Sequence, residues 1–226
     1  MQFAHIPPLA VSLFSLLATI SLLMSFVMLG SRWLSNYLYA FSVESLMIAA
    51  LSAAVGYYGG YPELYLIALL TALFRGLVLP YLVWQIVKST QINREIHAAL
   101  RPSTCLVLGA FAVVFALLVA VRIAQHTNLD ETIIVLALTV MLSMKLIGFL
   151  MLSVRHQAIS QVLGLLVLEN GIFLGSQILV PGMPMLLELV ILFDLLIVVA
   201  CFGVLVRYLM RHVGNTDTTQ LRKLVG

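Results

Sequence analysis

Seven long apolar stretches follow one another along this chain, separated by short polar segments. Each is about 20 residues long, which is the length an α-helix needs to cross roughly 30 Å of hydrocarbon. Helices close their backbone hydrogen bonds internally, so they are the expected element inside a bilayer. The pattern predicts an all-α, polytopic transmembrane bundle of about seven helices at residues 8–29, 36–57, 63–87, 103–121, 132–152, 157–179 and 185–209.

The first apolar stretch has the position of a secretory signal peptide but not its composition. Residues 1–8 contain no Lys or Arg, and no small-residue cleavage pattern precedes a polar mature start. We therefore predict that residues 8–29 form a membrane helix that the protein retains.

The composition agrees with a membrane protein and excludes a soluble enzyme. Of the 226 residues, 62% are hydrophobic and only 9% are charged. A soluble chain of this size could not bury so much apolar surface.

Basic residues collect on one side of the predicted bundle, and this asymmetry predicts its orientation. Cytoplasmic loops retain Lys and Arg, so the N-terminus is expected outside and the C-terminus in the cytoplasm. The opposite side has Arg122 alone, near Asp130 and Glu131. The formal net charge of +3 then indicates contact with anionic lipid headgroups, and no nucleic-acid partner is expected. The residues of the basic side are Arg32, Lys88, Arg94, Arg101, Arg155, Arg207, Arg211, Arg222 and Lys223.

The loops divide the chain into four parts. Residues 1–87 form an N-terminal three-helix set, and residues 88–130 a cytoplasmic loop with a linking helix. Residues 131–211 form a second three-helix set of the same orientation, and residues 212–226 a polar cytoplasmic tail. The equal orientation of the two sets is typical of a parallel duplication.

No metal or cofactor site is expected in this chain. Cys105 and Cys201 fall inside separate apolar spans without a neighbouring His or Cys at ligand spacing. The five histidines lie in loops or near span ends, where contact with solvent or headgroups is the expected role: His5, His97, His126, His156 and His212.

Five ionisable residues fall near the middle of predicted spans, where each costs several kcal/mol unless it is paired or neutral. They are Glu44, Arg75, Lys145, Glu169 and Asp194. One interpretation is a proton relay in the membrane plane, because neighbouring groups shift one another's proton affinity. The other is a set of static ion pairs, Glu44 with Arg75 and Glu169 or Asp194 with Lys145, which fix helix packing.

The surroundings of Glu169 are the most informative. At 100° per residue, Gln161, Ser176 and Gln177 fall on its half of the helix and predict a polar face. Gly164, Gly171 and Gly175 fall on the opposite half, where small residues let another helix pack closely.

Pro80 lies five residues after Arg75 and should bend the third span. The bend either opens space for water beside Arg75 or is the kind of proline that membrane helices tolerate routinely.

Two short segments resemble a known family. The segment Arg155-His156-Gln157-Ala158-Ile159, followed by residues 164–172 (GLLVLENGI), is similar to the hydrogenase-4 component E family. The resemblance implies a membrane subunit of a formate hydrogenlyase-type group 4 hydrogenase in a prokaryotic cytoplasmic membrane. It also likens the last three helices to the K-type subunit of complex I and to the C-type subunit of multisubunit cation/proton antiporters.

By this resemblance Glu169 corresponds to the membrane glutamate of the K-type subunits, and Asp194 lies in the helix that carries their second glutamate. The expected function is therefore a noncatalytic membrane-arm subunit that contributes to proton translocation or coupling. Its partners would be antiporter-like membrane subunits and hydrogenase redox-arm subunits, with the nickel-iron and iron-sulfur centres in those partners. Two alternatives remain open, an autonomous secondary transporter with a midplane site and a purely structural scaffold subunit.

Overall fold

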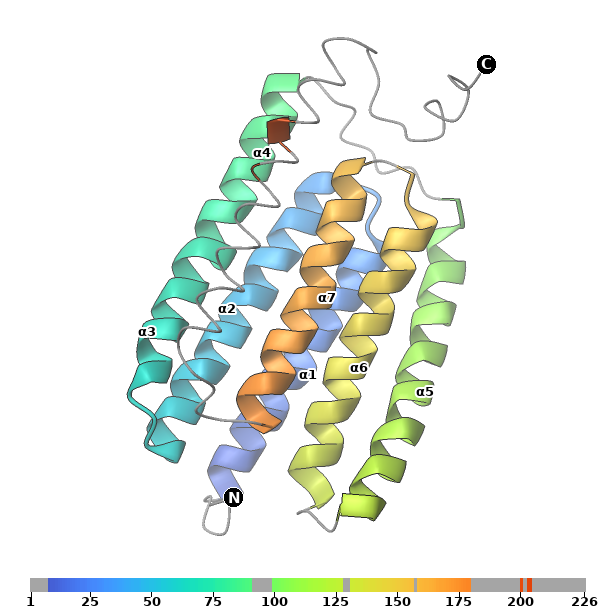
Figure 1. Ribbon diagram of the computed structural model, residues 1–226. Helices are drawn as coiled ribbons and strands as arrows, with labels where there is room; N and C mark the ends of the chain where they lie inside the picture. The colour runs from blue at the N-terminus through green and yellow to red at the C-terminus, as the bar shows by residue number, and fades with distance from the viewer. Residues whose placement is uncertain are drawn as a thin grey trace.

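The computed structural model describes residues 8–90, 99–127, 131–156, 158–179, 200, 203 and 204 of the chain. Within these ranges the protein is all-helical and contains no strand (Figure 1). The elements are α1 (Pro8–Gly30), α2 (Leu34–Gly59), α3 (Glu63–Leu70), η1 (Thr71–Val78), α4 (Leu79–Thr90), α5 (Pro102–Thr127), α6 (Glu131–Val154) and α7 (Ala158–Leu179).

Five helices are long and apolar enough to cross a membrane: Pro8–Gly30, Leu34–Gly59, Glu63–Gln85, Pro102–His126 and Thr132–Val154. They coincide with the first five predicted spans, so the all-helical membrane class is confirmed for the described part of the chain. The sixth predicted span corresponds to α7. The seventh, at 185–209, lies almost entirely outside the described residues.

The helices run side by side, and α7 lies between α2 and α6 (Figure 1). Helix α1 contacts α2, α5 and α6, so it closes the bundle behind α7. The continuous segment formed by α3, η1 and α4 packs against α2 at one edge, and α5 packs against α6 and α1 at the other. Helices α1, α2 and α6 therefore each have several helical neighbours, and α7 lies between two of them, α2 and α6.

The apolar core is divided into two clusters at different depths. The first lies toward the end of α1 and the start of α2, and includes Met28, Phe41, Ile147, Met151 and Leu163. The second lies toward the start of α1 and the end of α2, and includes Phe14, Ile48, Leu51, Val140 and Phe173. At the depth where the two clusters meet, α1, α2, α6, α7 and the α3–η1–α4 segment each contribute buried polar side chains, as described below.

Glycines allow α6 and α7 to pack at backbone contact. A Cβ on Gly148 would lie 2.7 Å from the backbone nitrogen of Leu168 and 2.8 Å from the carbonyl oxygen of Gly164. A Cβ on Gly171 would lie 2.8 Å from the Met144 Cβ, and one on Gly175 would meet the Met141 side chain. The structure thus places Gly164, Gly171 and Gly175 on the α7 face that contacts α6.

The third span contains a π-helix, η1, which ends two residues before Pro80. Proline has no N–H to donate, and its ring would collide with the carbonyl four residues earlier, that of Gly76. A wider π turn relieves such a conflict, and π-helical segments are frequent at functional sites. The buried Arg75 lies inside this segment.

Candidate functional site

A layer of buried polar side chains separates the two apolar clusters at mid-depth. Its members, which we call the polar layer, are each at most 1% exposed and come from five helical segments. Such groups are costly in a membrane interior and are retained where they have partners or a function. The polar layer consists of Ser21 and Ser25 of α1, Glu44 and Ser45 of α2, Thr71 and Arg75 of η1, Ser143 of α6 and Asn170 of α7.

Glu44 is held at the centre of the layer by two donors. The Ser25 hydroxyl donates to Oε1 at 2.6 Å, and the Asn170 amide nitrogen donates to Oε2 at 3.1 Å. Its side chain is completely buried. Both carboxylate oxygens are therefore hydrogen-bonded, each to a different neighbouring helix.

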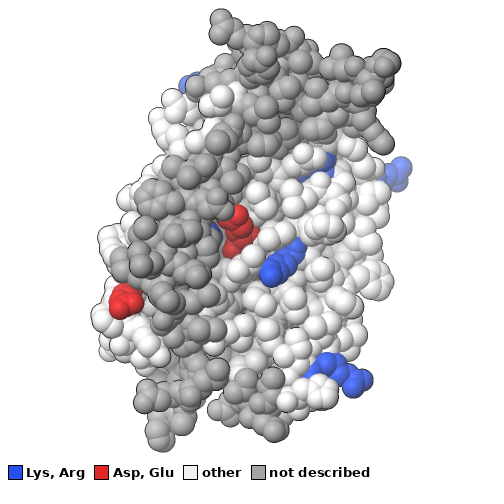
Figure 2. Space-filling view, in the orientation of Figure 1, with Lys and Arg blue, Asp and Glu red and all other residues white. Residues whose placement is uncertain are grey.

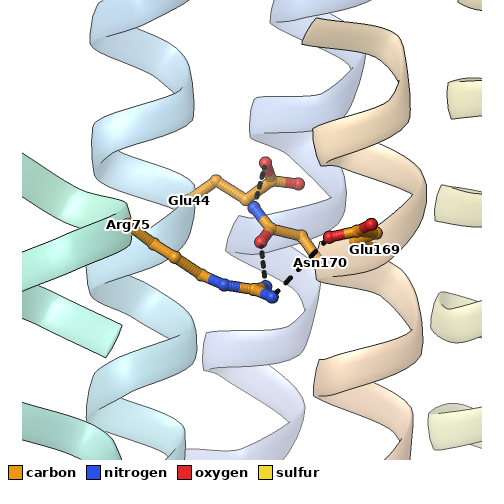
Figure 3. A network of polar contacts seen from close by, with 4 residues as sticks. All are labelled: Glu44, Arg75, Glu169 and Asn170. Atoms are coloured by element: carbon orange, nitrogen blue, oxygen red, sulfur yellow. Dashed lines mark hydrogen bonds and ion pairs between the residues drawn. The ribbon is translucent and has the colours of Figure 1, made fainter. Parts of the chain in front are cut away.

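Asn170 connects Glu44 to Arg75. While its amide nitrogen donates to Glu44, its Oδ1 accepts a hydrogen bond from Nη1 of Arg75 at 2.8 Å (Figure 3). The guanidinium also lies over the ring of Phe173, 4.9 Å from its centroid, in cation–π geometry. Glu44 and Arg75 are thus joined through the amide and not by a direct ion pair.

Arg75 reaches a second carboxylate on α7. Its Nη2 lies 3.9 Å from Oε2 of Glu169, which is an ion pair but too long for a hydrogen bond (Figure 3). The side chain of Glu169 is 19% exposed, against 2% for that of Arg75. Glu44, Asn170, Arg75 and Glu169 therefore form a connected series. It begins at the fully buried Glu44 and ends at the more exposed Glu169.

The charges of this series do not balance when both carboxylates are ionised. Glu44 and Glu169 contribute two negative charges against one positive charge on Arg75, which leaves −1 in a setting of low dielectric constant. Uptake of one proton by a carboxylate makes the set neutral. Of the two carboxylates, Glu169 is the more exposed, whereas Glu44 is fully buried and fixed by two hydrogen bonds.

Four polar atoms of the layer have no hydrogen-bond partner among the described residues: Ser45 Oγ, Thr71 Oγ1, Arg75 Nη2 and Ser143 Oγ. Buried polar atoms in native proteins are nearly always hydrogen-bonded, and ordered water often supplies the partner. The layer thus has hydrogen-bonding capacity beyond its own internal contacts.

Lys145, another predicted member of a relay, is joined to none of these four residues by a hydrogen bond or ion pair within the described part of the chain. Lys145 lies on α6 at the depth of Glu169, since its backbone nitrogen is 3.3 Å from where a Cβ of Gly171 would stand. Its side chain is half-buried. Figure 2 shows acidic and basic side chains close together near the middle of the face that it draws. Asp194 lies outside the described residues.

The predicted polar face of α7 is distributed along the helix and does not form one site. Gln161 donates to the carbonyl of Arg155 near the start of α7, and Ser176 donates to the carbonyl of Phe173 in its own helix. Gln177 is buried and donates to the Ser52 hydroxyl of α2 at 2.5 Å.

Arg155 has a structural position at one end of the bundle. Its Nη2 donates to the carbonyls of Met28 and Leu29, at 2.7 and 3.4 Å, and so caps the end of α1. The guanidinium lies 5.4 Å from the centroid of the Tyr37 ring, whose hydroxyl donates to the Leu163 carbonyl. Burial lowers the pKa of Arg155 from its ordinary value, but arginine remains charged.

The sequence did not single out six members of the polar layer: Ser21, Ser25, Ser45, Thr71, Ser143 and Asn170. A search for ionisable residues passes over amides and hydroxyls, and a serine in a membrane helix can satisfy itself on its own backbone, as Ser21 does. The available signal was the position of Asn170 directly after Glu169 in mid-span.

No cluster of three or more His, Cys, Asp or Glu residues suited to a metal occurs within the ranges that the structure describes.

Comparison with known proteins finds a relative in Mycobacterium tuberculosis. The chain is 33% identical to the uncharacterized protein Rv0085 of strain H37Rv over 154 residues, which is 66% of this chain and 67% of that protein. No family model matches the sequence, and no solved structure does.

Proposed function

The chain belongs to the family of the uncharacterized protein Rv0085 of Mycobacterium tuberculosis, and we propose that it is a proton-relaying subunit of a membrane complex. The parent complex is a complex I-like group 4 hydrogenase of the formate hydrogenlyase type, in a prokaryotic cytoplasmic membrane. The chain crosses the membrane seven times with its N-terminus outside, and the redox chemistry takes place in partner subunits.

The observation that supports the relay is the series Glu44, Asn170, Arg75 and Glu169 across three helical segments in the bundle interior. The series holds two carboxylates of different exposure around one guanidinium, so proton uptake by the more accessible one, Glu169, would change the charge that Arg75 faces. The resemblance to hydrogenase-4 component E supplies the parent complex, and Glu169 lies within the segment that carries it.

In the proposed mechanism Glu169 exchanges the proton and Arg75 transmits the electrostatic change. With Glu169 ionised, Arg75 is attracted to it across 3.9 Å. When Glu169 binds a proton, that attraction is lost, and the guanidinium is balanced by Glu44 alone through Asn170. Lys145, at the same depth on α6, and Asp194 continue the relay toward neighbouring subunits.

The relay is tested with Glu169→Gln in sealed vesicles that contain the assembled complex. We expect redox-driven proton translocation to fall by about 10² or more, the loss typical of removing a positioned proton-transfer group, while the complex still assembles. The matched control is Glu63→Gln, since Glu63 is an exposed glutamate at the start of α3. Unchanged translocation in Glu169→Gln would refute the relay.

The same experiment separates the relay from a scaffold. A structural role for Glu169 predicts that the conservative change to glutamine prevents assembly of the complex, because the helix contact with Arg75 weakens. Normal assembly with lost translocation is the result that supports the relay.

A further inference from the structure

Helices α2 and α7 are joined by three side-chain hydrogen bonds at regular intervals. The donors and acceptors on α7 are Leu163, Asn170 and Gln177, which are seven residues apart and therefore share one face of the helix. Their α2 partners are, in order, Tyr37, Glu44 and Ser52. Successive bonds are separated by about 10 Å along the helix axis.

We call the contact between α2 and α7, from Tyr37 and Leu163 to Ser52 and Gln177, the α2–α7 seam. The polarity of its buried residues differs on the two sides of the Glu44–Asn170 contact. Toward Tyr37, the buried residues of α2 and α7 belong to the first apolar cluster, among them Leu38, Phe41, Leu166 and Val167. The Tyr37 hydroxyl closes that side by donating to the Leu163 carbonyl at 2.7 Å.

Toward Ser52, the seam carries buried polar groups among apolar residues of the second cluster, such as Ile48 and Phe173. Ser45 and Ser52 are seven residues apart on α2, and both are completely buried. Gln177, 1% exposed, lies opposite on α7. Among the described residues, Oγ of Ser45 and Oε1 of Gln177 have no hydrogen-bond partner.

Hydrogen-bonding atoms without protein partners in such a stretch are suited to water. A site can hold an ordered water when it offers two to four polar partners. Ser45 Oγ and Gln177 Oε1 offer open positions at the two ends of this stretch. The Ser52 hydroxyl between them already donates to the Ile48 carbonyl and accepts from Gln177, so it keeps one acceptor position. The end of α7 follows Gln177 by two residues. Several waters in series would connect the layer to the surface there.

We propose that the α2–α7 seam between Glu44 and Gln177 is a water-filled proton access path, open at the bundle end where α1 begins and sealed at the other. It rests on the proposed relay, because it supplies the protons that the relay exchanges. Ser45, Ser52 and Gln177 position the water, and Tyr37 with the first apolar cluster prevents passage to the opposite side. Access from one side only is what a relay requires, since a path open at both ends would dissipate the gradient.

The path is tested by thiol accessibility, which does not depend on proton translocation. Ser52→Cys is placed in the full-length chain with Cys105→Ser and Cys201→Ser, in native membrane vesicles. The probe is a small, cationic, water-soluble methanethiosulfonate. The controls are Leu51→Cys and Ala40→Cys, because Leu51 belongs to the second apolar cluster and Ala40 to the first, and both are at most 1% exposed.

We expect Ser52→Cys to react at least about tenfold faster than either control, since a thiol in an apolar site is neutral and inert. The reaction should also occur with reagent on one side of the membrane only. Equal rates at Ser52→Cys and Leu51→Cys would overturn the path, and so would a reactive Ala40→Cys.

Gln177→Cys provides a second variant should Ser52→Cys fail to fold. If Ser52→Cys were unreactive while Glu169→Gln still lost proton translocation, the access path would be wrong and the relay would stand. The two proposals can therefore be refuted independently.

Discussion

At the scale of single residues, the site depends on an uncharged amide. Asn170 presents a donor to Glu44 and an acceptor to Arg75, so one side chain satisfies two buried charges of opposite sign. A carboxylate or an ammonium at this position could satisfy only one of them. Asn170 thereby fixes Glu44 in place, while Glu169, the residue before it on α7, remains the more accessible carboxylate.

Replacing Asn170 with alanine should destabilise the protein. The change removes the partners of Glu44 Oε2 and Arg75 Nη1, and a lost hydrogen bond to a buried charged group costs about 1–3 kcal/mol. We expect a lower thermal midpoint for the purified protein in mild detergent, measured by the loss of the monodisperse peak in size-exclusion chromatography. Asn36→Ala is the matched control, since Asn36 is exposed on α2. Equal midpoints for the two variants would show that the amide bridge contributes nothing to stability.

At the scale of elements, backbone geometry places the side chains of the site. The glycine contacts bring α7 close to α6 and determine which face of α7 remains for α2 and η1. The π-helical stretch of the third span alters the helical register before Pro80 and contains Arg75, whose guanidinium reaches α7. The polar layer thus depends on helix packing as much as on its own residues.

Gly148→Ala should disturb the α6–α7 pair. The added methyl group would lie 2.7 Å from the Leu168 nitrogen and 2.8 Å from the Gly164 oxygen, and these backbone atoms cannot rotate away. We expect a loss of about 1–3 kcal/mol in the free energy of unfolding, as for other overpacked sites. The thermal midpoint in detergent measures it. In the control Gly30→Ala, the new methyl meets only the Leu106 side chain, at 3.3 Å, and that side chain can move. A midpoint no lower for Gly148→Ala than for Gly30→Ala would contradict this account.

At the scale of the whole molecule, the described helices leave much apolar surface uncovered. In the fourth candidate span, Pro102–His126, only 22% of the 18-residue apolar stretch is buried inside the bundle. Exposed residues of this helix include Phe111, Val114, Phe115 and Leu118. Lipid or neighbouring membrane subunits suit such a surface.

The proposed parent complex predicts what co-purifies with the chain. After extraction of a tagged chain in mild detergent, mass spectrometry should identify antiporter-like membrane subunits together with nickel-iron and iron-sulfur hydrogenase subunits. The control is an unrelated tagged membrane protein of similar size from the same cells. Recovery of the chain alone would instead favour the autonomous transporter, which uptake by the purified chain in liposomes would then test.

The sequence by itself determined the membrane class, the helical character and the positions of five spans, because apolar length and low charge are local properties of the chain. It also indicated Glu44, Arg75 and Glu169, because an ionisable residue in mid-span is conspicuous without knowledge of its neighbours.

Only the tertiary structure decided how those residues are connected. Helical periodicity gives the faces of one helix but not its rotation against another, so the sequence could suggest a direct Glu44–Arg75 pair, whereas the fold places Asn170 between them. The hydroxyls of Ser45, Thr71 and Ser143 are inconspicuous in a sequence, since any serine or threonine in a helix can bond its own backbone. They become a polar layer only because packing brings α2, η1 and α6 to the same depth around α7.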